Sequence, residues 1–212
     1  MNYRDLLKMA RRAPLLKIKD ISSPYPLKPH EWVQLNSWTK KGLLVRLKRG
    51  IYTLPDSERA YPLAATWLAN QLYWPSYVSL QYALSFYGLI PEAVGAITSV
   101  STLKTTAIKN SLGVFLYKKV QPRYFFGFKT IPPTKGPGYW MATAEKALLD
   151  FIYLDAGKKS EMTSGLLTEG YRLQNLETLN VKILKQYLEK FDNVKVQKAG
   201  QLILALIDKR AS

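Results

Sequence analysis

The sequence contains no cysteine and only one histidine, His30, among its 212 residues. The absence of thiols excludes disulfides, zinc sites built on thiolates and cysteine nucleophiles, and it is compatible with a reducing compartment. A single histidine excludes metal sites with several histidines and any catalytic arrangement that needs a second one. We therefore expect no metal ion and no cofactor.

Long apolar runs are also missing. The N-terminal segment, MNYRDLLKMARR, carries charges where a secretory signal peptide needs an apolar stretch. No run of residues reaches the length of a membrane span. From these features we predict a soluble, cytoplasmic protein without a membrane partner.

Acidic residues are scarce: 15 Asp and Glu residues stand against 31 Lys and Arg residues, so the formal net charge is +16. Residues 1–50 hold 12 basic and 3 acidic side chains, a net charge of +9. A local field of this strength indicates a polyanionic partner. Nucleic acid is favoured over anionic lipid, because no segment pairs a basic face with a strongly apolar face at the length of an interfacial helix.

Residues 30–41 have the pattern of an amphipathic helix. Proline, which favours the first helical turn, stands at position 29, and Gly42 follows the segment. The face expected to be buried carries Trp32, Leu35 and Thr39. The face expected to point to solvent or to a ligand carries Gln34, Ser37 and Lys41. The pattern leaves open whether Trp38 lies in the core or faces outward.

After Gly42 the period changes to two, which is typical of a β-hairpin. With Arg49 and Gly50 as a two-residue turn, Lys48 pairs with Ile51. The pairs that follow are Leu47 with Tyr52, Arg46 with Thr53, and Val45 with Leu54. This register predicts an apolar face of Val45, Leu47, Tyr52 and Leu54, and a second face of Arg46, Lys48, Ile51 and Thr53.

A helix with a polar exposed face, followed by a hairpin with a cationic tip, is the plan of a winged helix-turn-helix. Its helix enters the major groove of DNA and its wing touches the flanking backbone. The alternative is a small domain whose basic hairpin only keeps a sheet edge solvated. The candidate DNA contacts are Arg46, Lys48 and Arg49 for phosphates or the minor groove, Gln34 and Ser37 for base edges, Lys28, Lys40 and Lys41 for the backbone, and His30 at the helix start.

The polar segment 55–59 predicts a domain boundary, with a winged-helix domain over residues 1–57 and a mixed α/β domain over residues 58–212. The expected fold class is α+β.

Before the basic helix we predict a helix over residues 2–12, a short element over 16–21 and a loop over 22–29. Beyond the boundary we predict helices at 61–73, 77–89, 143–154, 181–191 and 194–209, strands at 96–101, 113–118 and 124–130, a loop at 131–138 and an irregular segment at 155–170.

Three segments occur together in a recognisable order: GLLVRLKRGIYTLP from position 42, PSYVSLQYALSFYGLIPE from 75, and ATAEKALLDFIYL from 142. In their order and spacing, over roughly residues 3–155, the chain resembles the AbiEi-like antitoxins, which are transcriptional regulators of abortive-infection (phage-defence) systems. The resemblance implies an N-terminal winged-helix domain and a C-terminal domain that carries the antitoxin activity. It also implies repression of the protein's own operon at inverted repeats, and a cognate toxin that resembles nucleotidyltransferases.

Catalysis is not expected. Glu145, Lys146 and Asp150 suggest a nuclease site at first, but no second carboxylate cluster supplies a pair of metal ligands. Lys146 and Asp150, four residues apart, are expected to form a surface pair on the solvent side of their helix. Ser79 has neither a strained nucleophile turn nor a base partner in the sequence. Two further hypotheses stay open: a standalone regulator with a ligand-sensing C-terminal domain, and an enzyme that processes nucleic acid.

Overall fold

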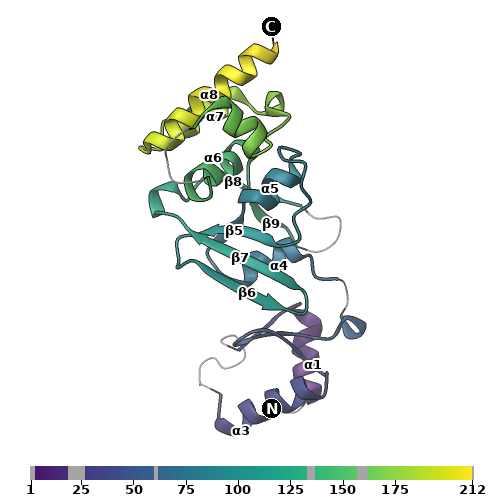
Figure 1. The fold of residues 1–212 in the computed structure, drawn as a ribbon. Coiled ribbons are helices and arrows are strands. Elements are labelled where there is room, and N and C mark those ends of the chain that lie inside the picture. Colours follow the sequence, from purple (N-terminus) through teal and green to yellow (C-terminus); the bar gives the residue numbers. More distant parts are fainter. Residues whose placement is uncertain (1–2, 19–26, 60–61, 133–136, 157–161, 212) are drawn as a thin grey trace.

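The computed structural model describes residues 3–18, 27–59, 62–132, 137–156 and 162–211, and within these ranges it is a mixed α and β structure. Figure 1 shows an elongated molecule with the N-terminal elements at one end, a β-sheet in the middle and the C-terminal helices at the other end. Among the described helices, none combines the length with the apolar composition that crossing a bilayer requires.

Within the described residues, the N-terminal unit contains two α-helices and a small antiparallel sheet. Its elements are α1 (Tyr3–Arg12), β1 (Leu16–Lys17), α3 (Pro29–Lys40), β2 (Val45–Lys48), β3 (Ile51–Thr53) and the short 3-10 helix η1 (Asp56–Glu58). The strand order is β1-β3-β2. The two predicted helices and the hairpin are therefore present, whereas half of the predicted element at 16–21 and most of the loop at 22–29 lie outside the described residues.

A compact apolar cluster joins these elements. It contains Leu6 of α1, Leu35 and Trp38 of α3, Leu44, and Tyr52 of β3. The Tyr3 hydroxyl donates to the Leu43 carbonyl over 3.3 Å. Trp38 is thus a core residue, and one face of the small sheet is covered by α1 and α3.

The register of the hairpin differs from the predicted one. Lys48 pairs with Ile51 as expected, but a β-bulge at Leu47 shifts the pairs that follow, so Arg46 faces Tyr52 and Val45 faces Thr53. Leu47 is buried in a second, larger apolar core, which is formed mainly by residues beyond position 62, while Tyr52 is buried in the N-terminal cluster. We call the part of the chain that forms this larger core the second unit. The predicted common apolar face is therefore wrong. One extra residue in a strand reverses the side-chain alternation, and here both faces of the sheet are covered, so both need apolar residues.

The second unit is built on a six-stranded mixed sheet with the order β6-β7-β5-β4-β9-β8. The strands are β4 (Ser76–Val78), β5 (Ile97–Ser101), β6 (Thr106–Asn110), β7 (Gly113–Lys119), β8 (Phe128–Ile131) and β9 (Tyr139–Ala142). β4 pairs with β9 and β5 pairs with β7 in parallel, and the other pairs are antiparallel. β5, β7 and β8 were predicted with shifted ends. β4, β6 and β9 were not predicted.

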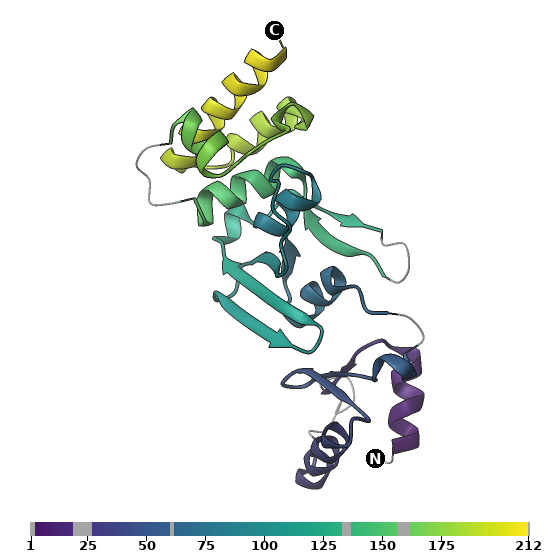
Figure 2. The same ribbon diagram turned by 45° about the vertical axis from the view of Figure 1, so that its right-hand side comes forward.

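Helices cover both faces of this sheet (Figure 2). These are α4 (Ala65–Leu72), α5 (Leu80–Phe86) and α6 (Ala144–Leu154). The helices α7 (Val181–Leu188) and α8 (Val194–Ala211) pack on α6, and the short helical turns are η2 (Pro122–Tyr124), η3 (Leu166–Gly170) and η4 (Leu176–Thr178). The Tyr117 hydroxyl donates to the Ala69 carbonyl of α4, and the Tyr77 hydroxyl donates to Asp150 of α6. β5 lies between the two strands and pairs its Val100 with Tyr77 and its Ser99 with Tyr117. Because Ser99 and Val100 are adjacent, the two tyrosines lie on opposite faces, and α4 and α6 lie on opposite sides of the sheet.

The sequence predicted a surface pair on α6, and this prediction is wrong: the Lys146 and Asp150 side chains are both completely buried. The Lys146 ammonium donates to Asp150 and, over 2.9 Å, to the Tyr77 hydroxyl. Asp150 also accepts from the hydroxyls of Tyr77 at 2.9 Å and Ser79 at 2.8 Å. Burial raises the pKa of the Asp150 carboxyl and of the Tyr77 hydroxyl, and it lowers the pKa of the Lys146 amine.

The Lys146 ammonium also lies among aromatic rings. Its Nζ is 5.0 Å from the ring centroid of Phe126, 5.4 Å from that of Tyr77 and 5.5 Å from that of Phe191. Gly127 has a φ of +72°, and a Cβ at this position would come within 2.9 Å of the Lys146 side chain. One buried cation therefore connects α6 with β4, with the 126–127 turn and with the segment between α7 and α8.

Replacing Lys146 by methionine should lower the free energy of unfolding by about 3–5 kcal/mol, because it leaves the Asp150 carboxylate buried without its counter-charge. The double variant Lys146→Met/Asp150→Leu should recover most of this loss. Urea denaturation of the full chain measures both effects.

The matched control is Arg123→Ala, which removes an exposed ion pair with Asp192 and should cost at most about 1 kcal/mol. Equal losses in Lys146→Met and Arg123→Ala would contradict the importance assigned to the buried pair.

Candidate nucleic-acid interface

Helix α3 begins and ends with local signals. Pro29 occupies its first turn, and the Glu31 carboxylate accepts a 3.0 Å hydrogen bond from the Lys28 backbone N–H. This hydrogen bond lowers the pKa of the Glu31 carboxyl. Lys40 lies in the last turn, and Gly42 follows with a φ of +71°. The helix is therefore fixed at both ends by its own sequence.

The exposed face of α3 is not the predicted one. Besides His30 in the first turn, its exposed side chains are spaced four, three and four residues apart, and they belong to Pro29, Val33, Asn36 and Lys40. Gln34 and Ser37 are only partly exposed, and the Gln34 Oε1 atom is buried without a hydrogen-bond partner among the described residues. The face is rotated because Trp38 is buried together with Leu35, whereas Trp32 and Thr39 lie at the edge of the core.

Asn36 and Val33 are thus candidate contacts that the sequence reasoning missed. Val33 is 68% exposed, so its branched apolar side chain is accessible to a partner. Asn36 carries an amide, which can form two hydrogen bonds with the edge of a base. Leu35 and Trp38 are three residues apart and form the buried pair. Had the sequence reasoning chosen this pair, the helical period would have placed Val33 and Asn36 on the exposed face.

A concavity lies between α3 and the β2–β3 hairpin. It has a volume of about 310 Å³ and is lined by Trp32, Asn36, Arg46, Arg49 and Tyr52. We call it the basic cleft. Arg46 and Arg49 are exposed. Four other residues that were predicted to contact DNA are exposed as well: Lys28, His30, Lys40 and Lys41. The structure therefore brings two of the three predicted hairpin cations together with α3.

Lys48, the third hairpin cation, faces the second unit. Its ammonium donates to the Leu72 carbonyl over 3.0 Å and lies 5.3 Å from the ring centroid of Tyr73. Two further hydrogen bonds cross the same junction, from Lys17 Nζ to Gln71 Oε1 at 2.9 Å and from Asn110 Nδ2 to the Leu47 carbonyl at 3.1 Å. Lys48 is held at the junction and is not among the residues that line the basic cleft.

The candidate catalytic side chains lie elsewhere and are buried. Glu145 is 6% exposed, and its Oε1 accepts from the Asn180 backbone N–H at 2.9 Å. Ser79 has an acidic partner after all, because its hydroxyl donates to Asp150. Among the described residues no group of three or more His, Asp or Glu side chains is arranged to hold a metal ion.

Comparison with known proteins gives no further assignment. No protein-family model matches this sequence, and no curated protein matches it significantly.

The junction role of Lys48 can be tested by comparing it with its neighbour. Lys48→Ala should lower the free energy of unfolding by about 1 kcal/mol, because the Leu72 carbonyl loses its charged donor in a partly buried place. Arg49→Ala, at an exposed position one residue away, should stay within about 0.5 kcal/mol of the parent chain. Thermal and urea unfolding provide the measurement, and a reversed order of the two variants would contradict the assignment.

Proposed function

We propose that this protein is a sequence-specific DNA-binding regulator whose N-terminal unit is a winged helix-turn-helix. The observation that carries the proposal is the basic cleft, where the outward face of a helix meets an arginine-bearing hairpin in a small sheet with the order β1-β3-β2. The net charge of +9 over residues 1–50 supports the same partner.

In this proposal α3 enters the major groove. Asn36 reads an adenine through its amide, and Val33 contacts a thymine methyl group. Arg46 and Arg49 contact phosphates on the flanking backbone, while Lys28, His30, Lys40 and Lys41 strengthen the attraction to the duplex without reading sequence. Gln34 and Ser37 remain secondary candidates at the side of the helix.

We further propose, from the resemblance to the AbiEi-like antitoxins, that the protein represses its own operon at inverted repeats. The second unit then counteracts a nucleotidyltransferase-like toxin. Of the three segments that carry the resemblance, the first covers the β2–β3 hairpin, the second spans β4 and α5, and the third is α6 with its cap.

A second candidate function is favoured by a cavity of about 620 Å³ in the second unit. In that case the protein is a standalone regulator whose second unit senses a ligand. A nucleic-acid-processing enzyme has less support, because the candidate catalytic carboxylates and Ser79 are buried.

A salt titration distinguishes residues that contact phosphates from residues that read bases. Arg49→Ala should weaken binding to every duplex and reduce the log–log salt slope by roughly 0.9 if it removes one phosphate contact. Asn36→Ala should keep the slope and cost about 1–3 kcal/mol on the native promoter only. The matched control is Gln34→Ala, a substitution on the same helix at a partly buried side chain, which should change promoter binding less than Asn36→Ala does.

Mobility shifts with the native promoter and with a shuffled duplex, at several salt concentrations, supply these values. Equal affinity of the parent chain for both duplexes at physiological salt would overturn the specific-regulator proposal and leave a general polyanion binder.

The antitoxin activity should be independent of DNA binding. The variant Arg46→Ala/Arg49→Ala, expressed from an unrelated promoter, should lose promoter binding and still restore growth of cells that express the product of the neighbouring gene. Growth assays with the parent chain and with empty vector are the controls. Loss of rescue by a stably accumulating variant would place the activity in the DNA-binding unit, and lack of toxicity of the neighbouring product would favour the standalone regulator.

A further inference from the structure

The second unit has a partly open cavity on the side of the sheet that carries α5 and α6. We call it the α5–α6 cavity. Its volume is about 620 Å³, and its walls are mainly apolar, with Leu80, Leu84, Ile90, Val94, Leu116 and Phe151 among the lining side chains. A volume of this size lies within the usual range of small-molecule sites, about 300–1,000 Å³.

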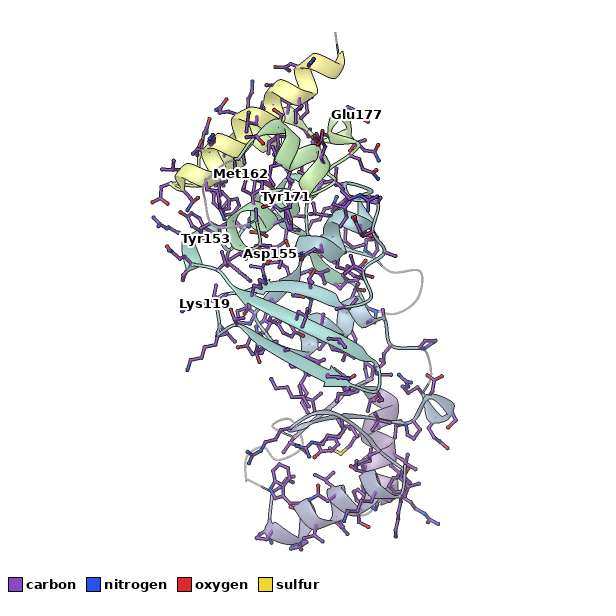
Figure 3. The ribbon with its side chains drawn as sticks, viewed as in Figure 1. Lys119, Tyr153, Asp155, Met162, Tyr171 and Glu177 are labelled. Carbon is purple, nitrogen blue, oxygen red and sulfur yellow. The ribbon has the colours of Figure 1, made fainter. Side chains whose placement is uncertain are left out.

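The charged side chains at the cavity are already paired with one another. Lys118 of β7 forms an ion pair with Asp155, which follows α6, and Gln81 of α5 donates to the same carboxylate over 2.8 Å. On the other side Arg172 pairs with Glu92 at 2.8 Å. The lining therefore offers a ligand hydrogen bonds, but it offers no cation or anion in need of a counter-charge. Asp155 and Tyr171, which both line the cavity, are labelled in Figure 3 in the region between the sheet and the C-terminal helices.

The floor of the cavity is held in an unusual backbone conformation. Leu80 has a φ of +59° although it is a branched residue and is only 1% exposed. The turn before it is fixed by two bonds to Thr98: the Ser79 N–H donates to the Thr98 carbonyl at 3.0 Å, and the Thr98 hydroxyl donates to the Ser79 carbonyl at 2.6 Å. Conformations of this kind cluster at binding and active sites, because surrounding structure must maintain them.

We propose that the α5–α6 cavity binds a small, neutral and mainly apolar molecule: an aromatic ring or a short branched chain that carries one hydrogen-bonding group. The apolar body contacts Leu84, Ile90 and Phe151, and the polar group bonds with Gln81 or with an outward lone pair of Asp155. A charged ligand is disfavoured because it would lose its hydration without gaining a free counter-charge. This inference gives the second candidate function its ligand class, and it does not depend on DNA binding.

Indole serves as the probe, with indole-3-acetate and tryptamine as anionic and cationic analogues of the same ring. In methyl-resolved NMR titrations of the full chain, indole should shift the signals of Leu84 and Ile90 in a saturable manner. Each charged analogue should bind at least about tenfold more weakly, because an unpaired charge would be buried. Absence of saturable shifts, or equally tight binding of a charged analogue, would overturn the proposal.

Filling the cavity should weaken binding. Val94→Trp places a ring in the cavity from a partly exposed loop, and Ala93→Trp does so from an exposed neighbour in case the first variant does not fold. Both should weaken indole binding by about tenfold or more. The control Val194→Trp, at a side chain that is 84% exposed on α8, should bind indole like the parent chain. Unchanged binding by a folded cavity variant would show that indole binds elsewhere. Promoter affinity, measured alongside, separates failure of this inference from failure of the DNA-binding proposal.

Discussion

The second unit depends on one buried ion pair. The Lys146 ammonium and the Asp150 carboxylate lose all contact with water, and their desolvation is offset only because Tyr77 and Ser79 complete the hydrogen bonds. These partners come from β4 and from the residue that follows it, so the pair fixes how α6 lies on the sheet. The ring contacts of Lys146 with Phe126 and Phe191 extend the same constraint toward the C-terminal helices. The polar side chains that suggested a catalytic site in the sequence thus form part of the core.

Much of the architecture follows from local patterns, and the errors have a common physical origin. The Thr143 cap and the apolar stripe of α6 could be predicted, because both depend on neighbours within one or two turns. The burial of Lys146 and Asp150 on the same helix could not, since their partners lie about 70 residues away on β4 and beside it. Tyr77 and Val78 of β4 were predicted as the start of a helix because Leu80, Ala83 and Leu84 continue the helical spacing. The positive φ of Leu80 ends that periodicity, and only the contact of Ser79 with Thr98 of the next strand explains it.

In the candidate DNA interface, too, the features set by neighbouring residues could be predicted and those set by distant contacts could not. The helix, its proline start and the arginines of the hairpin were visible in the sequence, while the rotation of α3 that exposes Asn36 in place of Gln34 required the position of Trp38 in the core. The bulge at Leu47 required a second covered face on the small sheet. Period-two reasoning assumes one buried face, and it fails wherever a small sheet lies between two packed layers.

The second covered face of the small sheet joins the N-terminal unit to the second unit. Leu47 is buried in the core of the second unit, Asn110 of β6 donates to its carbonyl, and Lys48 donates to the end of α4. The hairpin that carries Arg46 and Arg49 is therefore attached to the same sheet that lines the α5–α6 cavity with β5 and β7. β7 provides a direct path, because it pairs with β6 near the hairpin and contributes Leu116 and Lys118 to the cavity. A ligand or a protein partner that shifts β7 would act on these contacts, and through them on the hairpin that carries the two arginines. Under the proposed DNA-binding function, such a shift would change DNA affinity without any contact to the DNA.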